Sequence, residues 1–445
     1  MSRRRIRSTA RRWATATAVA ACLSLTAACG DSGLSAGQEG DGTGVITFWD
    51  NNGGVRTAVW KKIIAEFEKK HPEIKVRYVG VPINDVQSKY DTAIQGGGLP
   101  DVGGVSTSYL ATMVAQDALE PLGDRIADSA LKGKLSKGML ASVRAAGGRG
   151  EELYSVPTSA TQGVLWYRTD LFRQAGLERP ETWDDFYQAA ERLTDRDANR
   201  FGFTIRGGAG SVAQVLEAIY AQSGVPSFWK DGRTTVNDPR NVAALERYAA
   251  LYGRVTPKAD LNNDFTKMVA TFTGGTVGMM QHNLGSYTDH VKAFGEENIA
   301  GVPLPPARDG AGHTVVSNPV DGLGLFRSSD NKAAAWKFIE FAASAEMNSL
   351  WNEEAGQIPA NTEAAEADWV RRAQPVREAE KVLDDPDTTL VQLPYYLPDW
   401  NTLSKADSEP DLQKVLLGDM TAKEFLDSLA EKLNEAQAEW DEQHG

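Results

Sequence analysis

The sequence predicts an α/β fold built as two lobes of similar size. Short apolar runs rich in β-forming residues alternate with amphipathic helical stretches from residue 44 to the end of the chain. No internal repeat interrupts this alternation, and 445 residues are enough for two or three domains. The first strand, helix and strand have the spacing of a right-handed βαβ unit, which indicates a parallel pair of strands.

The first elements are the best defined. Val45–Trp49 is an apolar run that suits a strand buried on both faces, and residues 50–54 form a polar, Gly-ended turn. Apolar residues at helical spacing predict a helix over Val55–Lys70, which Pro72 ends. Alternating apolar and charged residues over 74–78 predict the second strand.

The rest of the chain continues the pattern less strongly. Helices are expected over 86–95, 109–116, 183–193, 211–223, 242–251, 331–343, 345–354 and 421–442. Strands are expected over 99–106, 164–167, 201–205, 277–280, 299–304 and 322–326. Thr182, followed three residues later by Asp185, is close to a capping box. Residues 123–150 are rich in Gly, Ala and Lys and are weakly patterned.

The N-terminus is typical of an export signal. Residues 1–28 contain six Arg and no acidic residue, and the uncharged stretch Ala14–Ala28 is shorter than the ~20 apolar residues of a membrane-spanning helix. The sequence before Cys29 resembles a bacterial lipobox, although Thr26 stands where a large aliphatic residue is usual. Cys22 fits that local pattern better, but cleavage there would leave almost no apolar region, so lipidation is expected at Cys29.

Composition limits the compartment and the partners. Residues 29–43 are Gly- and Ser-rich, which predicts a flexible tether after the lipidated Cys. Both Cys residues lie in or beside the signal, so the remaining chain cannot form a disulfide. Loss of residues 1–28 removes six Arg and takes the formal charge from −13 to −19. Such an acidic chain argues against nucleic acid as a partner.

Cofactor and catalytic motifs are poorly supported. Residues 208–213 fit the dinucleotide pattern G-x-G-x-x-A after a strand, but a strand-to-helix turn in mid-chain explains them equally. The five His are scattered, without H-E-x-x-H or a Cys pair, and neither G-x-S-x-G nor a Walker A sequence occurs. We therefore expect no cofactor, no metal and no catalytic residue.

Several segments resemble, in order along the chain, the extracellular solute-binding proteins of family 1 of bacterial ABC importers. This group binds mainly sugars and oligosaccharides and includes maltose-type binders. The segments that carry the resemblance are Ile46–Trp49, Leu99–Val102, Tyr154–Pro157, Val164–Phe172, Pro180–Phe186, Phe272–Met279 and Ala335–Phe341.

The resemblance implies a two-lobed, periplasmic-binding-protein-like (Venus-flytrap) fold with three crossings between lobes. The crossings are expected near 155–160, 301–305 and 359–363. They would divide the chain into an N-terminal lobe of 44–156 plus 302–360 and a C-terminal lobe of 157–301 plus 361–445. The ligand would be bound between the lobes, which close around it.

Sugar recognition needs planar hydrogen-bonding groups and aromatic platforms, and α/β sheets bind ligands beyond their strand ends. The candidate ligand-binding residues on this basis are Trp49, Asp50, Asn51, Asp101, Ser106, Ser108, Thr158, Trp229, Gln281, His282, Asn283, Asn318, Asp321, Tyr395 and Trp400. Each has a structural alternative: core packing for the aromatics, turn or cap formation for the carboxylates and amides, and hinge hydrogen bonding for Thr158. The trio 281–283 is expected to face Trp49–Asn51 across the cleft.

The expected function is therefore the binding component of an ABC importer, lipid-anchored at the outer face of the cell membrane. Its ligand would be a sugar or oligosaccharide and its protein partner the permease, with the binding protein itself a monomer. One alternative keeps the fold but binds a polyol, a glycerol phosphodiester or another polar solute. Another is a secreted carbohydrate-active enzyme, which would need two carboxylates roughly 5–9.5 Å apart across one site.

Overall fold

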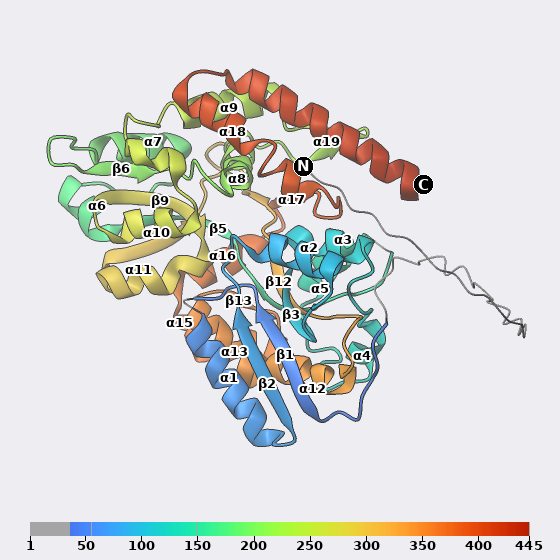
Figure 1. Cartoon of the computed structure of the whole chain (residues 1–445). Helices are drawn as coiled ribbons and strands as arrows, with labels where there is room; N and C mark the ends of the chain where they lie inside the picture. The colour runs from blue at the N-terminus through green and yellow to red at the C-terminus, as the bar shows by residue number, and fades with distance from the viewer. Residues whose placement is uncertain (1–35, 55, 149, 445) are drawn as a thin grey trace, which may run out of the picture. The chain divides into compact units, whose positions relative to one another are not determined.

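The computed structural model describes residues 36–54, 56–148 and 150–444. The expected signal peptide and Cys29 lie outside the described residues. Two separate main sheets organise the described chain, and Figure 1 shows helices packed around each. An α/β fold with strands and helices alternating along the chain is therefore confirmed.

The first sheet has the strand order β13-β4-β12-β3-β1-β2. Its strands are β1 (Gly44–Asp50), β2 (Ile74–Gly80), β3 (Val102–Ser106), β4 (Val156–Ala160), β12 (Val320–Leu325) and β13 (Ile358–Pro359). β1 pairs in parallel with β2 and β3, as the opening βαβ pattern predicts, while β12 runs antiparallel between β3 and β4.

This topology collects several strand ends at one edge. β1, β3 and β4 all end there, and the antiparallel β12 begins there. Asp321 on β12 is in register with Ser106 on β3 and with Ser159 on β4. We call this the first-sheet edge.

The second sheet has the order β10-β5-β9-β6. Its strands are β5 (Gly163–Arg168), β6 (Phe201–Thr204), β9 (Val277–Asn283) and β10 (Ile299–Pro303). β5 is antiparallel to both β9 and β10, which places Gly163 opposite Asn283 and Val164 opposite Pro303. We call the edge formed by these four residues the second-sheet edge.

The two edges meet because the connections between them are short. β4 of the first sheet ends at Ala160 and β5 of the second begins at Gly163, so only Thr161 and Gln162 separate them. A second connection, residues 304–319, leads from the end of β10 to the start of β12. Both connections join the same two edges, and a ligand crevice is expected beyond such strand ends.

The core of the first sheet explains its opening sequence. Helix α1 (Thr57–Lys70) buries Trp60 and Phe67 on its apolar face. Phe48 of β1 lies edge-on to Trp60, with ring centroids 4.6 Å apart. Phe338, on α12 (Lys332–Ala342), contacts both Phe48 and Phe67. This aromatic cluster fixes α1, and hence the turn before it, against the sheet.

Other helices cover the sheets or connect their strands. They are α2 (Val86–Gly96), α3 (Thr107–Ala115), α4 (Gly123–Ala127), α5 (Lys137–Gly147), α6 (Thr169–Ala175), α7 (Trp183–Arg192), α8 (Ser211–Ser223), α9 (Pro239–Ala249), α10 (Phe265–Thr273), α11 (Tyr287–Phe294), α13 (Ala345–Ala355), α14 (Thr362–Ala365), α15 (Asp368–Arg372), α16 (Gln374–Asp384), α17 (Trp400–Leu403), α18 (Glu409–Leu417) and α19 (Ala422–His444). Short 3₁₀ helices are η1 (Lys258–Asn262), η2 (Leu284–Ser286) and η3 (Glu296–Asn298), and small ribbons pair β7 (Trp229–Lys230) with β8 (Arg233–Thr234) and β11 (Thr314–Val316) with β14 (Thr389–Val391).

Local signals are partly confirmed. The capping box of α7 is present, because Asp185 N donates to Thr182 Oγ1 over 3.1 Å and Thr182 N donates to Asp185 Oδ2 over 2.9 Å. Burial of β1 on both faces is wrong: Ile46 and Phe48 are buried, but Val45 is 57% exposed. The second face of β1 is only partly covered by helices.

The weakly patterned region 123–150 contains two helices that the sequence did not predict. In α5, Met139, Val143 and Ala146 are buried at helical spacing, and Ser136 caps the helix. The small and basic residues between them obscured this periodicity. Short helices of this kind form because one face packs on the sheet rather than through intrinsic propensity.

The tether expected over residues 29–43 is wrong for its last part. Gly37 N donates to Arg327 O over 2.8 Å, and Ala333 N donates to Glu39 O over 2.8 Å. Lys337 Nζ donates to Gly42 O over 3.0 Å. Residues 37–42 are therefore bound along the start of α12, because their backbone groups find partners there.

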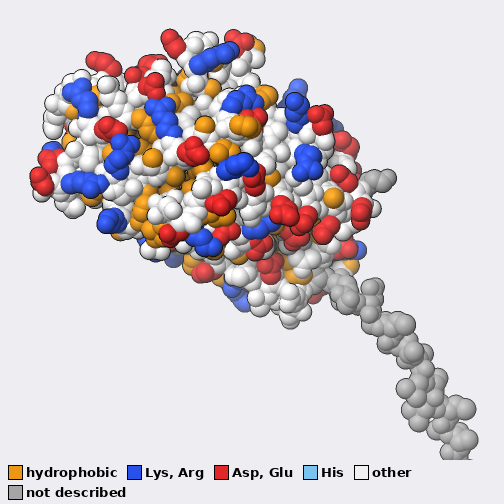
Figure 2. Space-filling model, turned by 90° about the horizontal axis from the view of Figure 1, so that it is seen from above, with side chains coloured by type: hydrophobic (Ala, Val, Ile, Leu, Met, Phe, Trp, Pro, Cys, Tyr) orange, Lys and Arg blue, Asp and Glu red, His pale blue; other side chains and the backbone are white. Residues whose placement is uncertain are grey.

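One face of the molecule carries charges of both signs. On the face shown in Figure 2, basic side chains are interspersed with acidic ones and apolar side chains appear between them. None of the helices in the described ranges combines the length and the apolar character that crossing a bilayer requires.

Candidate functional site

Polar side chains gather at the first-sheet edge and form what we call the first polar cluster: Asn51, Ser106, Tyr109 and Asp321. Asn51 Nδ2 donates to Tyr109 Oη over 3.1 Å and lies 3.5 Å from Asp321 Oδ1. Asn51 rests on the β3 backbone at Gly104, where an added Cβ would collide with its side chain. The turn after β1, the end of β3 and the start of β12 thus place these groups together.

Asp321 is the electrostatically unusual member of this cluster. Burial raises its pKa to about 6, the negative charge of Asp50 acts in the same direction, and hydrogen bonds from Ser106 and Asn51 oppose the shift. The carboxyl is therefore short of hydrogen-bond donors relative to water. A ligand that brings hydroxyl donors to it would stabilise the ionised form.

Thr158 and Ser108 flank the cluster. Thr158 Oγ1 donates to the Asp321 carbonyl over 3.2 Å, while its own carbonyl accepts from Asn348 Nδ2 over 2.7 Å. Ser108 Oγ donates to Ser106 Oγ over 3.2 Å. Thr158 thus makes the hinge hydrogen bonds of its structural alternative and also contacts the backbone of the cluster.

Asp50 and Trp49 border the cluster from β1. Asp50 is buried and accepts from Tyr78 Oη over 2.7 Å and from Asn52 N over 2.9 Å, so both of its oxygens hold the turn. Burial raises its pKa. Trp49 is half-buried, with Lys89 Nζ 4.3 Å from its ring centroid.

Asp101 is not brought to this edge. It precedes β3 and so lies at the opposite end of the sheet. Its Oδ2 accepts from Thr47 N over 2.7 Å, and its Oδ1 accepts from Ser329 Oγ over 2.5 Å. These contacts fasten β1 to the turn after β12, which is the structural alternative for this carboxylate.

A second polar cluster lies at the second-sheet edge and consists of Gln162, Glu217, Gln281 and Asn318. Gln281 Nε2 donates to Glu217 Oε2 over 3.0 Å, and Asn318 Nδ2 donates to Glu217 Oε1 over 2.6 Å. Burial raises the Glu217 pKa, and these two hydrogen bonds oppose the shift. Each carboxylate oxygen keeps capacity for a further donor.

Gln162 completes this cluster from the β4–β5 connection. Its side chain is buried, and no described residue donates a hydrogen bond to its Oε1. Gln162 and Glu217 line a cavity of about 10 Å³ together with Gly163, Pro303, Leu304, His313, Thr314, Val315 and Val316. A space of this size is at the lower limit for one water molecule.

The trio 281–283 ends β9, as predicted, but its three side chains have different surroundings. His282 is buried, with Nδ1 3.0 Å from Ser286 Oγ, and burial lowers its pKa. Asn283 Oδ1 accepts from Gly285 N over 3.0 Å and so caps the following turn. Only Gln281 contacts the second polar cluster.

Aromatic side chains from two segments pack together near the second polar cluster. Tyr395 and Trp400 are buried and meet edge to face, with centroids 6.0 Å apart, and Trp400 meets Phe228 in the same way at 6.2 Å. Tyr395 Oη donates to Ser317 O over 2.9 Å, next to Asn318. Thr112 Oγ1 of α3 donates to Pro398 O over 2.7 Å, so this segment is also attached to the first sheet's helices.

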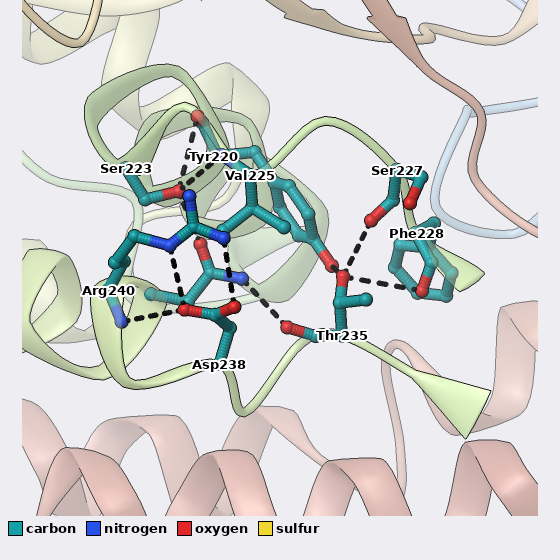
Figure 3. Close-up of polar contacts among 9 residues, drawn as sticks. Tyr220, Ser223, Val225, Ser227, Phe228, Thr235, Asp238 and Arg240 are labelled. Carbon is teal, nitrogen blue, oxygen red and sulfur yellow. Dashed lines mark hydrogen bonds and ion pairs between the residues drawn. The ribbon is translucent and has the colours of Figure 1, made fainter. Parts of the chain in front are cut away.

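A hydrogen-bond network holds the loop that carries Phe228 and Trp229 (Figure 3). Tyr220 Oη lies 2.8 Å from Thr235 Oγ1, which donates to Ser227 O over 2.6 Å. Ser223 Oγ donates to Asn241 Oδ1 over 2.6 Å. The end of α8 and the start of α9 thereby fix the loop and leave Trp229 half-buried on β7.

A larger groove of about 270 Å³ lies elsewhere, on the first sheet's helices. It is lined by His71, Lys134, Lys337, Glu340, Phe341, Asn361 and Glu363, among others, and contains no member of either cluster. The candidate site is therefore defined by the two sheet edges and not by this groove.

Comparison with known proteins identifies the arrangement. The profile that describes bacterial extracellular solute-binding proteins matches residues 52–349, about two thirds of the chain. The chain belongs to this family.

Individual relatives agree. The mannitol-binding protein of Pseudomonas aeruginosa PAO1 is 30% identical over 262 residues, which cover 58% of this chain and 56% of that protein. The sn-glycerol-3-phosphate-binding periplasmic protein UgpB of Shigella dysenteriae is 23% identical over 356 residues, 76% of this chain and 79% of that protein. The GacH receptor of Streptomyces glaucescens GLA.O, solved unliganded and with acarbose, has a TM-score of 0.78 at 23% identity and covers 89% of this chain and 99% of its own.

These findings confirm the two-lobed fold and the class of function. The GacH likeness shows the fold, and membership of the family makes the chain an extracellular solute-binding protein rather than an enzyme. The dinucleotide pattern at 208–213 leads into α8, as the alternative explanation requires. There the Gly210 N–H is bound by the Glu409 side chain.

In this solute-binding protein, three polar groups of the candidate site were missed by sequence reasoning: Tyr109, Gln162 and Glu217. Glu217 lies on α8, whose other buried residues are almost all apolar, and a lone carboxylate on such a helix was the available signal. Gln162 lies between β4, which the sequence did not predict, and β5. Its importance depends on where β4 ends and β5 begins, which only the pairing of the strands reveals.

Substituting Gly104 by alanine tests the first polar cluster. The new Cβ would collide with the Asn51 side chain and displace it from Tyr109 and Asp321. We expect roughly tenfold weaker ligand binding, the equivalent of one hydrogen bond of about 1.4 kcal/mol. Gly123→Ala is the matched control, since its Cβ would have nothing within 4 Å. Equal affinity of both variants in isothermal titration calorimetry would remove Asn51 from the site.

Proposed function

We propose that this solute-binding protein captures a sugar or sugar alcohol between the first-sheet and second-sheet edges and delivers it to the permease of an ABC importer. The observation that carries the proposal is the pair of partly buried carboxyls, Asp321 and Glu217, on facing edges of the two sheets. Both have raised pKa values and free acceptor capacity. The names of the relatives support a polyhydroxylated ligand, since one binds mannitol and another was solved with acarbose.

The chemistry of recognition follows from the donors and acceptors present. Carboxylate oxygens accept hydrogen bonds from ligand hydroxyls, and the amide groups of Asn51 and Gln162 can bond the same kind of group. Because the ligand contacts both edges at once, it binds the closed arrangement of the lobes better than an open one. That difference shifts the population towards closure without a covalent step.

Other residues near the two sheet edges also belong to the proposed binding site. Ser106, Thr158, Gln281, Asn318 and Trp229 border the two clusters, and in our proposal they shape the cleft around the ligand. We propose the same lobe limits as the sequence predicts, 44–156 plus 302–360 and 157–301 plus 361–445. β5 in the second sheet and β12 in the first support the order of these segments, whereas β4 (Val156–Ala160) pairs wholly in the first sheet and β10 (Ile299–Pro303) wholly in the second, so both strands extend across the proposed limits.

We further propose that the protein is a monomer anchored through a lipid on Cys29 at the outer face of the cell membrane. The sequence before Cys29 supports the anchor, and the family supports an extracellular location. Metabolic labelling with an alkynyl fatty acid would test it. Label should enter the wild-type chain and be absent from Cys29→Ala, whereas label lost only from Cys22→Ala would assign the anchor to the other cysteine.

A thermal-shift screen tests the ligand class. A ligand that binds only the folded chain at 100 times its Kd should stabilise it by about 2.7 kcal/mol. We expect a clear rise in Tm with at least one member of a panel containing D-mannitol, maltose, maltotriose and acarbose. Cleavage of an oligosaccharide during incubation, or no shift with any polyhydroxylated compound, would contradict the proposal.

A polyol phosphate is the second candidate, and one observation favours it. Arg206, just after β6 at the second-sheet edge, is half-buried, and burial lowers its pKa to about 10. Its positive charge helps to lower the pKa values of His282 and Lys405. A guanidinium held there could bind a phosphate. A Tm rise with sn-glycerol-3-phosphate, but not with glycerol or mannitol, would favour this ligand.

A further inference from the structure

We propose that Arg56 is a positioning residue that sets the angle between the two lobes by binding backbone carbonyls from both of them. Arg56 Nη1 donates to Glu354 O over 2.6 Å, and Nη2 donates to Ala355 O over 3.2 Å. Nη2 also donates to Gly285 O over 2.7 Å. The inference rests on the proposed function for its purpose, but its test needs no ligand.

The three carbonyls come from different lobes. Glu354 and Ala355 are the last residues of α13, which contacts α1 and β13 of the first sheet. Gly285 lies in η2, directly after β9 of the second sheet. One guanidinium therefore joins a helix end on one lobe to the turn after a strand on the other.

The helix end provides a suitable site for a cation. The last carbonyls of an α-helix lack intrahelical partners and carry the negative end of the helix dipole. Arg56 supplies donors to two of them. The negative charges of Asp289 and Glu354 also favour its protonated form, although burial lowers its pKa.

Two further contacts join the end of α13 to α11 at the same place, which we call the interlobe seam. Thr288 Oγ1, on α11 beside the second sheet, donates to Glu354 O over 3.2 Å. Gly356, just after α13, has φ +67° and passes so close to Tyr287 that an added Cβ would lie 3.0 Å from the Tyr287 Cβ. The backbone is thus shaped for close approach of the two lobes at this point.

The position of Arg56 in the chain connects the seam to the candidate site. Arg56 immediately precedes α1 and follows the turn that carries Asn51. Gly285 follows β9, which carries Gln281. The Arg56–Gly285 contact therefore links the segment that carries Asn51 to the segment that carries Gln281. Arginine suits this task better than lysine, because its planar fork can serve three acceptors while an ammonium on a flexible stem cannot hold the same geometry.

The test measures the lobe arrangement in the ligand-free, full-length chain. Cys22 and Cys29 are replaced by Ser, and spin labels are attached at Lys69→Cys on α1 and Lys292→Cys on α11, both exposed positions. Pulsed electron–electron double resonance then reports the distance distribution between the lobes. In Arg56→Ala we expect a second, broader distance to appear. The ratio of its population to that of the wild-type distance should rise roughly tenfold, because one strong contact is lost. Arg56→Lys should restore the wild-type distance in part.

Matched variants separate positioning from general surface charge. Lys62→Ala removes an exposed ion pair with the Glu354 side chain, 3.4 Å long, but leaves the carbonyls and Arg56 in place, so its distribution should equal that of the wild type. Thr288→Val should shift the distribution in the same direction as Arg56→Ala, by less. An unchanged distribution in folded Arg56→Ala overturns the proposal. If Arg56→Ala does not fold, wild-type distributions in both Arg56→Lys and Thr288→Val overturn it.

Discussion

Glu217→Ala is expected to weaken ligand binding about 10- to 100-fold while leaving the chain folded. A hydrogen bond to a charged group contributes about 1.5–3 kcal/mol, and every 1.4 kcal/mol is tenfold in Kd. Folding should tolerate the change because burial already disfavours the ionised carboxyl, so its removal also removes a desolvation cost. Gln281 and Asn318 each lose an acceptor, but Glu217 lines a small cavity, and removal of its side chain would enlarge that space for water.

Isothermal titration calorimetry with the best ligand of the screen provides the measurement. Glu217→Gln should also bind weakly, because its amide NH2 replaces one carboxylate oxygen and faces the amide donor of either Gln281 or Asn318. Glu246→Ala, an exposed carboxylate on α9, is the control and should bind like the wild type. Wild-type affinity in both Glu217 variants would place the ligand away from the second polar cluster.

The same carboxyl gives a pH dependence of affinity. Ligand hydroxyls donate to the ionised form, so binding should lower the raised pKa of Glu217 and release a proton. Affinity should therefore fall as pH is lowered through that pKa. Glu217→Gln should lose this part of the pH dependence, and an unaltered profile would exclude Glu217 as its source.

Asp321→Asn is expected to stabilise the ligand-free chain at pH 7.5 by up to about 3 kcal/mol. The Asp321 pKa is raised to about 6 in the folded chain, against about 3.9 for an unfolded Asp, and each pKa unit corresponds to about 1.4 kcal/mol. A raised carboxyl pKa means that the folded chain binds the proton more tightly than the unfolded chain. This contribution to stability is complete below pH 4 and is lost as pH rises through about 6.

Urea unfolding at pH 5 and pH 7.5 measures the effect. The neutral Asn does not titrate, so the stability gap between variant and wild type should widen from pH 5 to pH 7.5. Asp260, whose pKa burial raises to about 7, titrates in both chains and cancels from the difference. Asp309→Asn, at an exposed site, is the control. A gap that stays constant between the two pH values would mean that Asp321 is not the group that titrates.

The fold could be predicted in outline because its opening elements have clear periodicity. Phe48, Trp60 and Phe67 are spaced so that one strand face and one helix face meet, and the structure packs them together. The helices α4 and α5 could not be predicted in the same way. Their buried residues are few, and their stability comes from the sheet beneath them rather than from local sequence.

The candidate site was harder to predict because side chains near strand ends have two uses. Asn51, Asp321 and Thr158 do lie together at the first-sheet edge. Asp50 and Asp101 are aspartates beside strand ends, like Asp321. Their oxygens, however, accept hydrogen bonds from the protein's own backbone and hydroxyl groups. Only the direction of each strand and the register of its neighbours distinguish the two cases.

Contacts between distant segments left no local signal at all. Arg56 appears in the sequence as one of many surface arginines, and its carbonyl partners are more than 200 residues away. The second polar cluster likewise combines two connections, a helix and a strand. Such sites depend on the topology of both sheets, which a single sequence does not specify residue by residue.

The two-residue connection between β4 and β5 has a consequence for selectivity. Rotation about such a short pivot moves nearby atoms little and distant atoms far. Gln162 and Glu217 lie beside the pivot, so we expect them to keep nearly the same spacing in every state of the protein. Asn51 follows β1, which β12 and β3 separate from β4, so it would travel farther. Residues beside the connection would then select the chemical group of the ligand that they contact. Residues farther from it would determine how long a ligand the closed protein can enclose.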